Sequence, residues 1–301
     1  MLKYLSAAVA LKLFSLNSAT RSGYRYLGNL VGQKKRGQQD INEYVTRGDL
    51  LVDLARKYGL LENDAAVVEL GTGWIHWFGL YLSMHAQGDL QLELFDVWDN
   101  RQLDALKQSF SKLADRWEQE NNTDTRRREA LDAIQDAASF EELYERFNAH
   151  YTISSEGSLA GYPAATYNAV ISFHVLEHIG RGFIENSIGD MYRMLKPGGY
   201  CIHQIGIDDH LAHYDSRVSK KHYLSYSLSK RKYLFENVVQ YHNVLQGEDY
   251  QRFFRDAGFE ILETDRERCD IENLRIHPEW EGYSREDQET TILTLVCRKP
   301  L

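Results

Sequence analysis

The segment VVELGTGW, residues 67–74, places a carboxylate and two glycines at the end of an apolar run. Glycines there let the backbone approach a bound nucleoside closely, but a dinucleotide fingerprint needs a third glycine, and His76 stands at that position. A carboxylate repels a pyrophosphate and attracts a cationic ligand. The segment therefore favours a positively charged nucleoside over a dinucleotide, with a plain strand–helix turn as the alternative.

Two more acidic residues follow predicted strands. Asp96 comes about twenty residues after the glycines, where a carboxylate can accept hydrogen bonds from ribose hydroxyls. Glu156 ends a third predicted strand, where a polar side chain can reach an adenine amine. The three acidic positions together predict a nucleoside site.

Histidines are concentrated between residues 174 and 242, which hold seven of the eleven in the chain. We expect His210, in the segment GIDDHLAHYD, to be a general base. It stands beside Asp208 and Asp209, and a neighbouring carboxylate can fix its tautomer and raise its pKa. We expect Asp209 to assist it in catalysis. His174 is the second choice, and Glu177 either faces the reaction centre or caps the following helix. Asp and His also suit metal ions. The sequence alone assigns no metal here, and a polar surface loop is the remaining alternative.

Predicted strands alternate with predicted helices, which indicates an α/β fold with a doubly wound, mostly parallel sheet and an antiparallel closing strand. The charged residues 100–149, divided by a turn-like NNTD, are too long for a usual crossover and predict a helical insertion. The expected strands are residues 65–70, 90–98, 151–156, 168–176, 200–207, 260–267 and 291–300. The expected helices are residues 41–60, 74–86, 181–195 and 247–259.

The N-terminal residues form a basic arm. Residues 1–39 contain seven Lys or Arg and no Asp or Glu, in a chain with a net charge of −9. Apolar residues recur at helical spacing and predict an amphipathic helix that is too short and too interrupted to span a bilayer. Its surface can dock on the protein's own core, on a second copy in a homodimer, or, through residues 1–36, on a membrane. The apolar residues are Leu2, Leu5, Val9, Leu13 and Leu16.

Composition narrows the class of protein further. Three widely spaced cysteines indicate a reducing compartment, so we expect a cytoplasmic protein, associated with a membrane if the arm docks there. The negative net charge is unfavourable for nucleic-acid binding. We expect an N-terminal helical arm over residues 1–61 and one large domain over residues 62–301.

Four motifs occur in the order and spacing of a known family: VVELGTGW, LFDVWDN, YNAVISFHVLEHI and MYRMLKPGGYCIHQIG. Over roughly residues 62–300 the chain resembles the class I S-adenosylmethionine-dependent methyltransferases, including a bacterial methyltransferase-domain subgroup. The resemblance implies a Rossmann-like methyltransferase sheet and S-adenosylmethionine as cofactor, whose positively charged sulfonium suits an acidic, glycine-lined pocket. It places Glu69, Gly71 and Gly73 at the methionine moiety, Asp96 at the ribose and Glu156 near the adenine. The remaining expected cofactor contacts are Thr72, Val97, Gly157 and His174.

The acceptor is expected to be a small molecule or a glycan. Aromatic and polar residues between 210 and 245 suit a sugar or a hydroxylated ring, so we expect O-methylation of a saccharide or another small hydroxylated metabolite. The alternatives are a lipid-borne acceptor reached through the basic arm, and a protein that holds S-adenosylmethionine without turnover. The short motif LEHI, which contains His178, recurs across methyltransferases of differing substrates, so we expect a structural role for His178.

Overall fold

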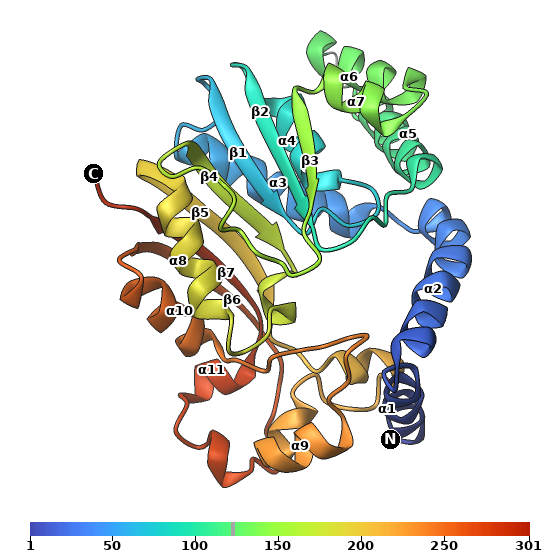
Figure 1. Ribbon diagram of the computed structural model, residues 1–301, viewed down its shortest axis with the longest axis vertical. Helices are drawn as coiled ribbons and strands as arrows, with labels where there is room; N and C mark the ends of the chain where they lie inside the picture. The colour runs from blue at the N-terminus through green and yellow to red at the C-terminus, as the bar shows by residue number, and fades with distance from the viewer. Residues whose placement is uncertain (122–123) are drawn as a thin grey trace. The chain divides into compact units, whose positions relative to one another are not determined.

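The computed structural model describes residues 1–121 and 124–301, and for residues 33–37 it describes the helix but not the side chains (Figure 1). Three basic residues of the arm, Lys34 to Arg36, and residues 122–123 of the NNTD turn thus lie outside what is described. The strands are β1 (Ala65–Leu70), β2 (Leu90–Asp96), β3 (Ala149–Ile153), β4 (Tyr167–Phe173), β5 (Leu195–Gly206), β6 (Glu260–Arg268) and β7 (Thr290–Arg298).

These strands form a seven-stranded sheet in the order β3-β2-β1-β4-β5-β7-β6. β1 runs parallel to β2 and β4, β2 runs parallel to β3, and β6 runs antiparallel to β7. The predicted parallel sheet with an antiparallel closing strand is confirmed. The order reverses between β1 and β4, and ligands bind at such reversals in open α/β sheets, outside the carboxyl ends of the strands.

The chain divides into two compact units. The first, which we call the glycine-loop unit, comprises Gly28–Ser172, Arg193–Ile202 and Leu301. The second, the histidine unit, comprises Met1–Leu27, Phe173–Tyr192 and His203–Pro300.

The glycine-loop unit contains β1 to β3, most of β4 and the predicted helical insertion. Its helices are α3 (Asn42–Lys57), α4 (Trp77–His85), α5 (Leu103–Gln119), α6 (Thr125–Asp136) and α7 (Phe140–Arg146). Side-chain caps begin the last two, because Asp124 accepts a hydrogen bond from the amide of Arg127 and Ser139 accepts one from the amide of Glu142. β1 is almost entirely buried, as expected for a central parallel strand.

The histidine unit contains β6, β7 and the remaining helices. These include α1 (Leu2–Phe14), α9 (Leu228–Leu234), α10 (Gly247–Asp256) and α11 (Arg285–Glu289). α8 (Ile184–Met194) lies mostly in this unit, and α2 (Ser18–Gln38) extends from it into the other. Among the described residues, no helix is both long enough and apolar enough to cross a membrane.

The predicted arm helix forms as α1 and docks on its own unit, but not through the predicted face. Tyr4, Ala8 and Leu11 are buried in a cluster with Leu211 and Phe235. The five residues of the predicted stripe lie on the other side and are 44–80% exposed. Since Tyr4 carries a hydroxyl and Ala8 is small, the docking face does not show as an apolar stripe in the sequence.

Candidate functional site

The loop after β1 adopts a conformation that requires glycine. Gly71 and Gly73 have φ angles of 68° and 65°, in the left-handed region that glycine enters without a steric penalty. The amide of Gly71 donates to the carbonyl of Phe95 at 2.7 Å, and the amide of Gly73 donates to Asp96 Oδ2 at 3.1 Å. No heavy atom lies within 4 Å of a Cβ built on Gly73, so the loop backbone there is open to close approach.

Asp96 joins this loop to the end of β2. Its carboxylate accepts hydrogen bonds from the amides of Val97, at 2.7 Å, and Gly73. Burial raises the pKa of Asp96, and these backbone hydrogen bonds oppose the rise. Gly157, at a φ of 68°, would carry a Cβ only 3.5 Å from Val97. The structure thus brings four expected cofactor residues together, while the neighbouring Glu156 lies in an exposed turn three residues beyond β3.

Glu69 is buried within β1, at 1% exposure. Its Oε2 accepts a hydrogen bond of 2.8 Å from the amide of Gly79 in the first turn of α4. Burial raises the pKa of Glu69 to about 8, so the carboxyl group is mostly protonated at neutral pH in the ligand-free protein. Thr72, in the glycine loop, is also buried.

His76 explains why the third glycine of a dinucleotide fingerprint is missing. It precedes α4 in a left-handed conformation, with φ at 45°, and is fully buried. Its ring packs against those of Phe140, Tyr144 and Tyr151, and burial lowers its pKa to about 3. In a dinucleotide-binding protein, glycine at this position lets the helix pack closely on the sheet. Here the side chain of His76 packs against the helical insertion instead.

In the histidine unit, His174 and Glu177 meet the end of β5. His174 Nδ1 lies 3.2 Å from Glu177 Oε1, and the same oxygen accepts a hydrogen bond of 3.1 Å from the amide of Gly206. A Cβ on Gly206 would come within 2.8 Å of both side chains, so glycine is required there. Burial raises the pKa of Glu177, but the hydrogen bond with His174 opposes the rise, and the pKa lies below its usual value.

The contacts of His210 differ from those expected. The nearest carboxylate is Asp208, with Oδ1 3.7 Å from His210 Nε2, whereas Asp209 accepts hydrogen bonds from Tyr4 and from the amide of Leu211. The expected rise in the pKa of His210 is wrong, because burial outweighs the carboxylate and lowers it to about 4. Of the two aspartates that precede this histidine, Asp208 and not Asp209 is its acidic neighbour.

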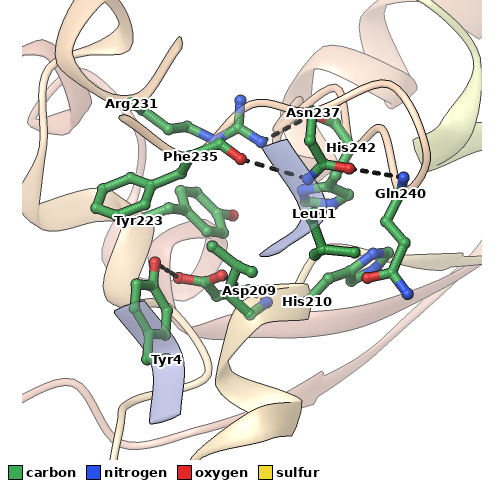
Figure 2. Close-up of a pocket in the computed structure, with 11 residues that line it drawn as sticks. Tyr4, Leu11, Asp209, His210, Tyr223, Arg231, Phe235, Asn237, Gln240 and His242 are labelled. Atoms are coloured by element: carbon green, nitrogen blue, oxygen red, sulfur yellow. Dashed lines mark hydrogen bonds between the residues drawn. The ribbon is translucent and has the colours of Figure 1, made fainter. Parts of the chain in front are cut away.

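A small cavity lies beside His210. Its volume of about 20 Å³ is enough for about one water molecule. Figure 2 shows Tyr4 of α1 pointing at Asp209 at its edge, and α1 also contributes Leu11. Neither Tyr4 nor Arg231 stands out in the sequence, because Tyr4 lies in an apolar helix and Arg231 lies in a charged segment that does not distinguish it from surface residues. The polar and aromatic lining includes Tyr4, Asp209, His210, Tyr223, Arg231 and His242.

A glycine loop after the first strand and a carboxylate at the end of the second, on this sheet, are features that Rossmann-like methyltransferases share with dinucleotide-binding proteins. A family model described as a methyltransferase domain matches residues 42–264, and the chain belongs to this family. It is an enzyme of the S-adenosylmethionine-dependent class, with S-adenosylmethionine as cofactor. No curated protein sequence matches the chain.

Solved structures give a consistent but distant likeness. An S-adenosylmethionine-dependent methyltransferase from Methanosarcina mazei is 14% identical, with 82% of this chain and 97% of that one covered and a TM-score of 0.46. The [4+2]-cyclase SpnF is 16% identical, with coverages of 84% and 81% and a TM-score of 0.46. Phosphoethanolamine N-methyltransferase 2 from Haemonchus contortus, in complex with S-adenosyl-L-methionine, is 13% identical, with coverages of 82% and 51% and a TM-score of 0.45.

Proposed function

We propose that this methyltransferase methylates a hydroxyl oxygen of a saccharide or another small hydroxylated metabolite. The observation that carries the proposal is the lining of the cavity in the histidine unit. Hydroxyl, carboxylate, guanidinium and imidazole groups converge there with aromatic rings. Such a set can donate to and accept from a hydroxyl group, and a cavity of about 20 Å³ has room for one hydroxyl of a ligand rather than for the whole ligand.

In this proposal Gly71, Gly73 and Asp96 hold the cofactor, and His210 removes the proton from the acceptor. The acceptor oxygen forms a bond to the methyl carbon while the S–CH₃ bond breaks. The electron pair of the broken bond stays on sulfur, which becomes a neutral thioether, and the hydroxyl proton passes to His210. A pKa of about 4 keeps His210 neutral at neutral pH, so its ring nitrogen can accept a proton, but it also makes His210 a weaker base than an ordinary histidine.

The acceptor specificity is testable with labelled cofactor. Purified protein is incubated with methyl-labelled S-adenosylmethionine and a panel of saccharides, polyols and hydroxylated aromatics, followed by fractionated cell extract. We expect label on an oxygen atom of a small, hydroxyl-rich product. Label found only on nitrogen or carbon would overturn the proposal, and cofactor binding without any labelled product would favour the silent-binding alternative.

A second candidate, methylation of a lipid-borne acceptor, is supported by the exposed face of α1. Leu2, Val9 and Leu16 are each more than 60% exposed, and residues 1–39 contain no acidic residue. An exposed apolar stripe on a basic helix matches a membrane surface that contains anionic lipid. In this case α1 would bring the histidine unit to an acceptor held in the bilayer.

Flotation with liposomes tests this candidate. We expect the protein to float with vesicles containing anionic phospholipid and less with neutral vesicles, and the double variant Val9→Glu, Leu13→Glu to stay at the bottom. Phe183→Glu removes a side chain that is 69% exposed elsewhere in the same unit and is the matched control. Absence of flotation contradicts membrane docking. If the double variant instead turns a dimer into a monomer in sedimentation, the stripe binds a second copy of the chain.

A further inference from the structure

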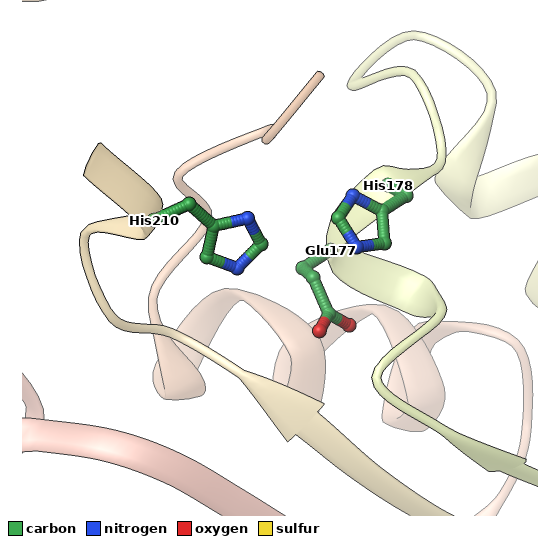
Figure 3. Close-up of side chains that lie close together, drawn as sticks. All are labelled: Glu177, His178 and His210. Atoms are coloured by element: carbon green, nitrogen blue, oxygen red, sulfur yellow. The ribbon is translucent and has the colours of Figure 1, made fainter. Parts of the chain in front are cut away.

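Three side chains near the cavity form a group with the composition of a metal site. Glu177, His178 and His210 each offer one ligand atom, and these atoms lie within 4.8 Å of one another. Figure 3 shows His210 on one segment facing Glu177 and His178 on another. Glu177 and His178 belong to the short 3₁₀ helix Leu176–His178 that follows β4, and His210 begins the 3₁₀ helix His210–Tyr214 that follows β5.

Glu177 supplies an independent indication of a cation. Its side chain is fully buried, and Oε1 is engaged by the amide of Gly206 and by His174. Glu177 Oε2 is inaccessible to solvent, and it has no hydrogen-bond partner among the residues that the structure describes. A buried carboxylate oxygen without a partner costs free energy, and a bound cation removes that cost.

His178 is oriented as a metal ligand. Its Nδ1 lies 2.7 Å from the carbonyl oxygen of Tyr241, and a carbonyl can only accept, so Nδ1 carries the proton. The lone pair is then on Nε2. Metal-binding histidines commonly donate their second ring N–H to a backbone carbonyl in this way, which fixes the tautomer and the ring.

We propose that Glu177, His178 and His210 bind one divalent first-row transition ion. Two imidazole nitrogens and one carboxylate oxygen suit ions from Mn²⁺ to Zn²⁺ better than Mg²⁺ or Ca²⁺, which prefer oxygen ligands only. In a tetrahedral site, metal bonds of about 2.0–2.2 Å hold two ligand atoms about 3.3–3.6 Å apart. The ligand atoms lie within 4.8 Å of one another, so the widest pair needs to close by at most about 1.5 Å.

Three protein ligands leave coordination positions open, as in catalytic rather than structural metal sites. The role of the ion rests on the proposed O-methylation. An acceptor hydroxyl in an open position would be oriented by the metal, and its pKa would fall. The metal site itself does not depend on that role, because binding can be measured without an acceptor.

The test is a titration of the full-length protein after removal of metal with a chelator. Mn²⁺, Co²⁺, Zn²⁺ and Mg²⁺ are added in turn, with calorimetry as the readout and the visible absorption of protein-bound Co²⁺ as a second. We expect one equivalent to bind, with Mg²⁺ weakest. His178→Ala and Glu177→Gln should each weaken binding at least about tenfold, the lower bound reported for the loss of groups that only support a ligand.

His213→Ala is the matched control. Its ring also contacts His210, with centroids 5.6 Å apart, but its Nε2 lies 2.5 Å from Asp208 and outside the proposed ligand set. The His213→Ala variant should bind the metal with the same affinity as the wild type. Binding of S-adenosylhomocysteine shows that each variant is folded. The proposal is overturned if no ion binds, or if folded His178→Ala and Glu177→Gln variants bind as tightly as the control. Metal binding without O-methylation would refute only the proposed function.

Discussion

Replacing Glu69 by glutamine should stabilise the ligand-free protein, and the gain should grow as the pH rises. Glu69 is 1% exposed, and its pKa is raised from 4.5 to about 8 because burial disfavours the charged form. Glutamine has nearly the same shape and can still accept the hydrogen bond from the amide of Gly79. The substitution therefore removes the ionisation of this side chain and little else.

The sign follows from proton binding in the two states. Below pH 4.5 the carboxyl is neutral in both the folded and the unfolded chain, so wild type and Glu69→Gln differ little. Between pH 4.5 and about 8 the unfolded chain releases the proton while the folded protein keeps it. The stability of the wild type then falls by about 1.4 kcal/mol per pH unit relative to the variant. The accumulated difference is about 3 kcal/mol at pH 7 and about 5 kcal/mol above pH 8.

The assay is urea unfolding of the ligand-free wild type and Glu69→Gln between pH 5 and pH 8.5. We expect the difference in the free energy of unfolding to widen steadily across this range. Glu129→Gln changes an exposed glutamate of α6 and is the control for a surface substitution. If the difference in the free energy of unfolding between Glu69→Gln and wild type is the same at every pH, the pKa of Glu69 does not differ between the folded and the unfolded chain, and the reasoning is refuted.

Two further predictions concern the cofactor and the base. Asp96→Ala should weaken binding of S-adenosylmethionine and S-adenosylhomocysteine by about 1.5–3 kcal/mol, as for a lost charge-assisted hydrogen bond. Calorimetry checks this, and saturable binding of NADH with no heat from either ligand would contradict the assignment of the site. His210→Ala should lower turnover on an identified acceptor by at least about 10²-fold, with S-adenosylmethionine affinity within a factor of about three. Steady-state kinetics of His210→Ala and His174→Ala, measured side by side, shows which histidine is the general base. If His210→Ala keeps near-full turnover and His174→Ala loses turnover, the base is His174 at the end of β4.

Most of the sheet could be predicted because its strands are short apolar runs that end at turn residues. β1 has the predicted bounds, and the three helices of residues 103–146 confirm the predicted insertion. No separate helix was predicted at α2 within the helical arm, since residues 18–38 are polar, contain four glycines and bury little. β3 begins two residues earlier and ends three residues earlier than predicted, because the sequence there alternates weakly. That shift places Glu156 in a turn and not at a strand end.

The glycine loop and the surroundings of His210 differed in how far the sequence could predict them. The glycine loop and Asp96 are local features, because each follows its own strand directly and neighbouring parallel strands end at the same edge. The surroundings of His210 depend on contacts across long stretches of chain, including the hydrogen bond from Tyr4 to Asp209, 205 residues away. No spacing within GIDDHLAHYD distinguishes Asp208 from Asp209 as the neighbour of the histidine. Only the direction of the chain after β5 decides it.

His178 separates the two ways in which this site can activate a hydroxyl. If His210 acts as a base alone, His178 has no part in the reaction, and His178→Ala should retain turnover with or without added metal. If His210 and His178 hold an ion together, both substitutions should lower turnover in parallel, and excess metal should partly restore it. A nitrogen bound to metal cannot also accept the acceptor's proton, so the proton would then leave to water or to His174. His174 is the candidate for that role because its Nδ1 lies 3.2 Å from Glu177 Oε1 and its Nε2 has no hydrogen-bond partner among the described residues. Loss of turnover in His178→Ala and in His174→Ala, with cofactor affinity unchanged in both, would therefore identify the metal-assisted route.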